Sequence, residues 1–125
     1  MNELTRAEEQ VMQILWKIER GFVKDVVEHL NNPKPAYNTV STIIRILEKK
    51  GFIGHKAYGK TYEYFPIVSK KEYTKSFLGS FLNRYFSNSF QQLVSFFSNE
   101  NEMSLEEMEK IRLFIEKEIK NKKGK

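Results

Sequence analysis

A stripe of polar side chains follows one face of the helix predicted over residues 37–50. Advancing about 100° per residue places its members at i, i+4, i+7 and i+11. They are Asn38, Thr42, Arg45 and Lys49, with Ser41 at the edge and Thr39 in the same turn. Amide, hydroxyl, guanidinium and ammonium groups hydrogen-bond to base edges and phosphates. The stripe contains no acid, so it predicts a surface for double-stranded DNA.

The sequence contains no known catalytic motif. The absence of cysteine excludes disulfides, thiolate metal sites and a cysteine nucleophile. His29 and His55 fall on different predicted elements without neighbouring ligands, so we expect structural or surface roles and no metal site. No nucleophile elbow, Walker loop, zinc-protease or dinucleotide motif occurs. We therefore expect no cofactor and no enzymatic activity.

Two preceding helices must position the polar stripe. Residues 5–8 (Thr-Arg-Ala-Glu) fit a capping box that begins the first helix. An apolar face then recurs at the helical period: Ala7, Val11, Ile14, Leu15 and Ile18. The second helix covers residues 22–30 and is ended by Asn31-Asn32-Pro33-Lys34-Pro35. The third helix ends at Gly51, and its predicted buried face consists of Val40, Ile43, Ile44 and Leu47.

A β-hairpin is predicted directly after the third helix. Aromatic and polar residues alternate over 52–57 and again over 61–65, and Gly59 lies between the two runs. Lys56 and Lys60 are expected at or near the tip of the hairpin. A helix-turn-helix followed by a two-stranded hairpin is the order of a winged helix, in which the third helix enters the major groove and the wing follows the backbone.

The composition changes after Pro66. Capping boxes at Ser69–Glu72 and Ser104–Glu107 mark two of three further predicted helices. Nine of the sixteen Phe and Tyr residues fall in these helices, and a segment this short buries too little surface to cover them alone. We therefore predict a homodimer, with an interface made by Tyr73, Phe77, Phe81, Phe90, Val94, Ile111 and Ile115.

The predicted fold is mostly α with a small β-hairpin. An N-terminal winged helix-turn-helix domain over 1–70 is followed by a three-helix dimerisation domain over 71–125, which ends in the basic tail 120–125. The formal net charge of +5 favours an anionic partner without proving one. No secretory signal and no membrane-spanning run occurs, so we expect a cytoplasmic protein without direct membrane insertion.

The segment from Pro33 to Tyr73, PKPAYNTVSTIIRILEKKGFIGHKAYGKTYEYFPIVSKKEY, closely resembles the BlaI/MecI/CopY penicillinase-repressor family of winged-helix transcriptional regulators. The segment LTRAEEQVMQILW is similar to the first helix of that family, and the resemblance continues collinearly through the C-terminal helices. It implies a homodimeric repressor on an inverted-repeat operator upstream of β-lactam-resistance genes. It also implies a membrane β-lactam sensor, and release through proteolysis in the dimerisation domain.

The sequence departs from this family pattern at two points. Copper-controlled members carry a C-terminal cysteine cluster, and the absence of cysteine here disfavours release by a metal. Antibiotic-responsive members are cleaved between an asparagine and a phenylalanine, where this chain has Phe96 and Phe97. Cleavage therefore either tolerates phenylalanine at position 96 or moves to the polar segment 98–101.

Two other interpretations remain open at the level of the sequence. The polar stripe has the residue types of an ordinary solvated helix face, and the hairpin lysines are common in turns. A winged helix can also be a protein-interaction module or an RNA-associated factor without sequence-specific duplex binding. Such modules often lack both a polar, acid-free third helix and a basic wing, and this chain has both.

Overall fold

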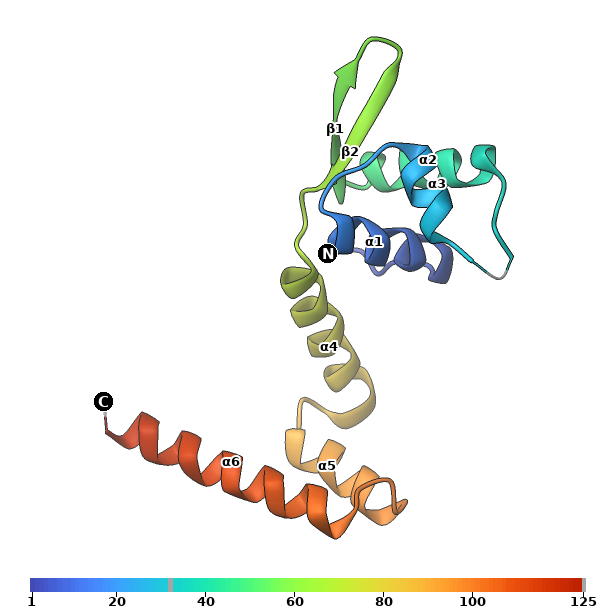
Figure 1. Cartoon of the computed structure of the whole chain (residues 1–125). Coiled ribbons are helices and arrows are strands. Elements are labelled where there is room, and N and C mark those ends of the chain that lie inside the picture. The colour runs from blue at the N-terminus through green and yellow to red at the C-terminus, as the bar shows by residue number, and fades with distance from the viewer. Residues whose placement is uncertain (32, 125) are drawn as a thin grey trace. The chain divides into compact units, whose positions relative to one another are not determined.

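The computed structural model describes residues 1–31 and 33–124 (Figure 1). The elements follow the order α1 (Arg6–Ile18), α2 (Val23–His29), α3 (Tyr37–Lys49), β1 (Ile53–Tyr58), β2 (Thr61–Pro66), α4 (Lys70–Phe86), α5 (Phe90–Asn99) and α6 (Leu105–Lys123). This order confirms the predicted fold class. Asn32, which is part of the predicted helix break, lies outside the described residues. Lys125, the last residue of the predicted basic tail, also lies outside them.

The contacts divide the chain into two compact units, Met1–Leu78 and Gly79–Lys125. The change of unit falls inside α4. The predicted domain boundary between residues 70 and 71 stays a prediction. In the described parts of the chain, no helix is both long and apolar enough to cross a membrane.

The first helix begins at the predicted capping box. The Thr5 hydroxyl accepts a hydrogen bond from the backbone N–H of Glu8 at 3.2 Å, and the Glu8 carboxylate accepts one from the Thr5 N–H at 2.9 Å. Glu8 is only 5% exposed, and the Lys50 ammonium donates to both of its carboxylate oxygens at 2.9 and 2.8 Å. Burial by itself raises the pKa of Glu8, but Lys50 and Thr5 together hold that pKa below 4.5. The pair therefore joins the start of α1 to the end of α3.

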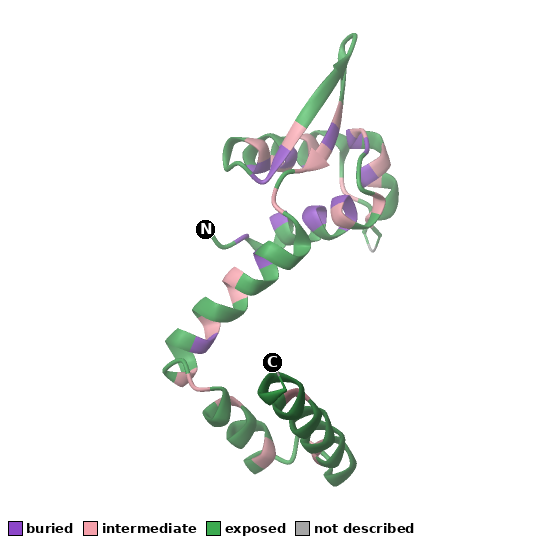
Figure 2. Ribbon diagram, turned by 90° about the vertical axis from the view of Figure 1, so that its left-hand side faces the viewer, coloured by how far each residue is buried: buried purple, intermediate pink, exposed green. Residues whose placement is uncertain are grey.

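The core of the N-terminal unit lies between the three helices and the base of the hairpin, where Figure 2 shows most of the buried positions. The fully buried side chains come from every one of these elements except β2: Val11, Met12, Leu15, Val26, Val40, Ile44, Leu47, Phe52 and Ile53. Met12 is an addition to the predicted α1 face. Ala7 belongs to the apolar face by its spacing but is exposed, whereas Glu8 in the same turn is buried in its contact with Lys50.

The hairpin is antiparallel, with Ile53 opposite Pro66 and Tyr58 opposite Thr61. The two-residue turn contains Gly59 at φ +63°, a conformation that glycine adopts without steric cost. The backbone of Tyr64 also exchanges hydrogen bonds of 2.9 and 2.8 Å with Gly21, in the loop between α1 and α2. This bridge holds the base of β2 against the helices.

The start of α4 belongs to the N-terminal core. The Tyr73 hydroxyl accepts a hydrogen bond from the backbone N–H of Leu4 at 2.8 Å, and its ring packs against Trp16 and Phe52. Tyr73 is 6% exposed, and Phe77 packs partly buried against the same core. Both residues were predicted at a dimer interface. In the single chain Tyr73 is buried and Phe77 is partly buried in this core, and their place at a dimer interface stays a prediction.

The C-terminal unit leaves much of its apolar surface uncovered. Ser89 and Ser104 cap α5 and α6, and the second cap completes the predicted box with Glu107. Neither helix contains a buried residue among those described, and both are mostly exposed in Figure 2. The α5 residues predicted at the dimer interface, Phe90 and Val94, are therefore uncovered within the single chain. The exposed residues include Phe90, Val94, Phe96, Phe97, Ile111, Phe114, Ile115 and Ile119.

The Glu8–Lys50 pair generates a prediction for acid stability. Because the pKa of Glu8 is lowered on folding, its contribution is present above pH 4.5 and is lost as the pH falls through the lowered value. Glu8→Gln keeps an oxygen for the Thr5 N–H but removes the charge. We expect it to cost about 1 kcal/mol at pH 7, or about 4–8 °C in Tm.

The difference in Tm between the wild type and Glu8→Gln should narrow as the pH is lowered below 4.5 in thermal melts. Glu9→Gln is the control, because it removes the same charge from the next residue, which is exposed. It should leave Tm nearly unchanged. A constant difference at all pH values would contradict this role for the Glu8 charge.

Candidate nucleic-acid interface

The two faces of α3 separate apolar from polar residues. Val40, Ile44 and Leu47 are completely buried, whereas the predicted polar stripe points away from the core. Its exposed members are Asn38, Thr39, Thr42, Arg45 and Lys49, and Ser41 is half-buried at the edge. Burial of one face therefore fixes the orientation of the other, and the polar groups reach solvent as one continuous surface.

Two hydrogen bonds organise the stripe along the helix. The Thr42 hydroxyl donates to the Asn38 carbonyl at 3.0 Å, and the Arg45 guanidinium donates to the Ser41 hydroxyl oxygen at 3.2 Å. Thr42 therefore has its proton engaged by the backbone. The guanidinium of Arg45 has five N–H donors and uses one of them here, so the others remain available for acceptors such as guanine or phosphate.

The two hairpin lysines occupy different positions. Lys60 lies in the turn beside Gly59, at the tip of the hairpin as predicted. Lys56 lies within β1 opposite Glu63, with its ammonium 5.3 Å from the centre of the Tyr58 ring. Both side chains are exposed. The wing thus carries one positive charge at its tip and one along its edge.

A contact between Glu48 and His55 joins the last turn of α3 to β1. The His55 Nδ1 atom pairs with the Glu48 carboxylate, and the His55 ring stacks on Tyr62 with centres 4.2 Å apart. Nearby, burial and the Glu48 charge raise the pKa of the Tyr64 hydroxyl, which therefore stays protonated. This contact could not be predicted from the sequence, because a helix residue and a strand residue seven positions apart share no periodicity.

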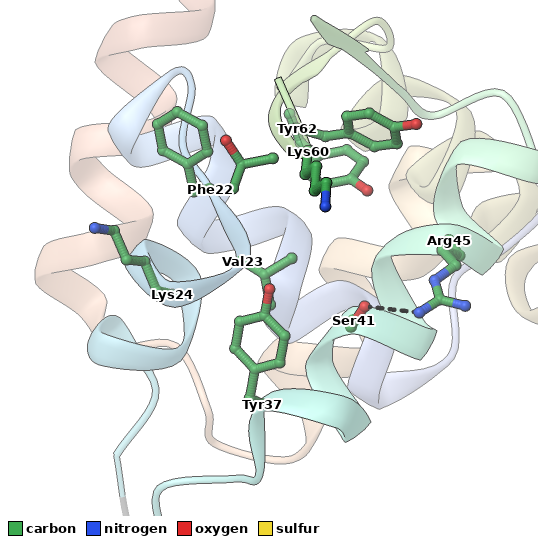
Figure 3. A pocket seen from close by; sticks show the side chains of 10 residues that line it. Phe22, Val23, Lys24, Tyr37, Ser41, Arg45, Lys60 and Tyr62 are labelled. Carbon is green, nitrogen blue, oxygen red and sulfur yellow. Dashed lines mark hydrogen bonds between the residues drawn. The ribbon is translucent and has the colours of Figure 1, made fainter. Parts of the chain in front are cut away.

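A cleft of about 510 Å³ lies between α2, the first half of α3 and the start of β2 (Figure 3). It brings together Ser41 and Arg45 of the stripe with Lys60 of the wing. None of the described residues that line it is acidic. Its other lining residues were not predicted: Phe22, Val23, Lys24, Tyr37, Thr61, Tyr62 and Tyr64. Lys24 and Tyr37 resemble ordinary surface residues in the sequence, and only the folded arrangement brings them beside the stripe.

The histidines take part in local contacts. His29 pairs through Nδ1 with the Asp25 carbonyl at 2.7 Å, and His55 contacts Glu48 and Tyr62. Among the residues that the structure describes, no group of three or more His, Cys, Asp or Glu side chains is placed to hold a metal ion.

Comparison with known proteins agrees with this arrangement. The family model described as penicillinase repressor matches residues 4–117. The chain is 28% identical over 116 residues to the methicillin resistance regulatory protein MecI of Staphylococcus aureus (strain N315), covering 92% of this chain and 94% of that protein. It is also 28% identical over 122 residues to the penicillinase repressor of Bacillus licheniformis, covering 97% and 94%.

A solved structure shares the fold of part of the chain. The solution structure of the DNA binding domain of the repressor BlaI superposes with a TM-score of 0.51 and 26% sequence identity. The match covers 57% of this chain and 88% of that one. The family model spans most of the sequence and the winged-helix likeness is independent of it, so this chain belongs to the penicillinase repressor family.

Proposed function

We propose that the protein is a homodimeric transcriptional repressor that binds an inverted-repeat operator in duplex DNA. The observation that carries this proposal is the exposed, acid-free stripe on α3, beside a wing with two lysines, in a chain of the penicillinase repressor family. The similarity to a protein described as a DNA binding domain supports the same ligand.

The side chains of the stripe divide by their chemistry. Asn38 and Arg45 offer paired donors and acceptors suited to base edges in the major groove. Lys49, Lys56 and Lys60 are flexible point charges suited to phosphates, which position a protein without specifying sequence. The hydroxyls of Thr39, Ser41 and Thr42 suit either kind of contact. We therefore assign sequence specificity to Asn38 and Arg45 and general affinity to the three lysines.

The uncovered apolar surface of the C-terminal unit supports dimerisation. Ile111, Phe114, Ile115 and Ile119 are all more than two-fifths exposed and lie at i, i+3, i+4 and i+8 on α6. Soluble chains rarely leave such a contiguous face open to water. A second copy of the chain would cover it, and an isologous pair would present two α3 helices to the two halves of an inverted repeat.

The names of the relatives, a methicillin resistance regulatory protein and a penicillinase repressor, support β-lactam-resistance genes as the targets. We propose a membrane β-lactam sensor or its protease as the partner that ends repression. The residues proposed for cleavage, Phe96 and Phe97, lie inside α5 and are 50% and 41% exposed. Segment 98–101 is not a free loop, because α5 continues to Asn99. A protease therefore has to unwind part of α5 at either position.

Replacement of Arg45 should separate specific from general binding. Arg45→Ala should cost about 1–3 kcal/mol on the operator and reduce discrimination at one base pair in each half-site. Lys60→Ala should weaken operator and unrelated duplexes equally. Footprinting shows the discrimination between base pairs, and titration of both variants with each duplex gives the affinities. Absence of duplex binding by the wild type would instead support a protein-interaction or RNA-associated module.

Introducing a charge into the apolar face of α6 should disrupt the dimer. Ile115→Glu places a carboxylate where a buried interface offers no partner, which is costly, so the sedimentation coefficient should fall to that of a monomer at micromolar concentration. Lys120→Glu introduces the same side chain at an exposed position on the side of α6 away from Ile111 and Ile115, and it should leave the dimer intact. A monomeric wild type, or a dimeric Ile115→Glu variant, would contradict the proposed interface.

Exposure of cells to a β-lactam should generate two fragments, with the cut after Phe96 or within segment 98–101. Such a cut would release the operator, because it removes the tether that joins the two half-site binding domains. Mass spectrometry of the protein recovered from treated cells locates the cut. Derepressed target genes with an intact chain would rule out proteolysis and would point to a bound effector.

A further inference from the structure

The cleft between α2, α3 and β2 contains side chains that the proposed base contacts do not use, chiefly Lys24 and Tyr37. We propose that this cleft binds a segment of the sugar–phosphate backbone of duplex DNA, with Lys24 and Tyr37 as additional phosphate contacts. The inference rests on the proposed function and adds to it a binding subsite outside the stripe and the wing.

The charge of the cleft favours a phosphodiester. Lys24, Arg45 and Lys60 line it, and none of the described lining residues is acidic. Glu48 follows Arg45 by three residues on α3 and is therefore within reach of its guanidinium on the helix surface. The Glu48 carboxylate is instead engaged by His55 of β1. The positive charge of Arg45 is thus left for an external anion.

The hydrogen-bond donors of the cleft also match a phosphate. The Ser41 oxygen accepts its bond from Arg45, so the Ser41 hydroxyl hydrogen stays available for another acceptor. Figure 3 shows the Tyr37 hydroxyl and the Lys60 ammonium directed into the cleft, while Lys24 lies at its outer rim. By contrast, the Thr61 hydroxyl donates to the Tyr58 carbonyl at 2.9 Å and is already engaged.

The shape and walls of the cleft select the occupant. Phe22, Val23 and Tyr62 provide apolar and aromatic surface that suits a deoxyribose, and about 510 Å³ is enough for a nucleotide unit but not for a folded partner. Arg45 belongs both to the cleft and to the stripe. A duplex that accepts α3 in its groove would therefore pass one strand across the cleft.

The test uses the full chain and two duplexes, one with the operator and one of unrelated sequence. Lys24→Ala should weaken binding to both duplexes about tenfold. It should also make the slope of log K against log salt less steep by about 0.9, because one phosphate contact is lost. Tyr37→Phe removes only a hydroxyl. It should weaken binding to both duplexes about tenfold but leave the salt slope unchanged, because a neutral donor releases no counterion.

Lys75→Ala is the matched control, because it removes the same charge from an exposed position on α4 outside the cleft. It should leave affinity and slope at wild-type values, and thermal melts should show that all three variants are folded. Wild-type binding with both cleft variants unaffected would overturn the backbone subsite while leaving the proposed function intact. Failure of the wild type to bind any duplex would overturn the proposed function itself.

A free nucleotide offers the same phosphate and sugar chemistry, and a separate titration distinguishes it. Thymidine monophosphate added to the full chain without duplex should show no saturation up to about 1 mM, because a single phosphate lacks the contacts made along a strand. Saturable binding below that concentration, lost in Tyr37→Phe, would assign the cleft to a free nucleotide and overturn its assignment to the DNA backbone.

Discussion

The buried face of α3 is the constraint on which the N-terminal unit depends. Val40, Ile44 and Leu47 have no exposed surface, and full burial of such side chains contributes about 1.5–3 kcal/mol each. The α1 and α2 helices and the base of the hairpin all pack around this face. Because the helix is anchored on one side, its opposite side cannot rotate inward. The same burial that stabilises the unit therefore presents the polar stripe to solvent.

The wing is oriented by contacts that also adjust the charge of the surface. The Gly21–Tyr64 bridge fixes the base of β2, and the stacking of His55 on Tyr62 ties the two strands together above it. Since His55 also engages Glu48, the acid on α3 pairs with the wing instead of with Arg45. One contact thus positions the hairpin and preserves the positive potential of the cleft.

Local signals in the sequence predicted most of the elements, because they depend on residues three or four positions apart. The box at Thr5 and Glu8 is of this kind, and the structure confirms it. Tyr73 shows where such signals fail. Its spacing with Phe77 is the same as that of the later aromatic residues, so periodicity could not show that its hydroxyl meets Leu4, 69 residues away. The cleft was missed for the same reason, since Lys24 and Tyr37 become neighbours of Lys60 only through the packing of α2 against α3.

Under the proposed function, the division into two units lets regulation act on residues other than those that contact DNA. A single stripe and wing would make few base contacts. In the proposed dimer, the effective concentration of the second half-site would raise the affinity by a factor of about 10²–10⁴. The exposed apolar residues of α5 and α6 would then control affinity without touching DNA. In the proposed dimer, any event that separates the helices of the two copies, whether a cut in α5 or a competing ligand, would lower operator occupancy without changing the N-terminal core. The marginal burial within the C-terminal unit is consistent with such a role, because elements with few buried contacts open at the lowest cost.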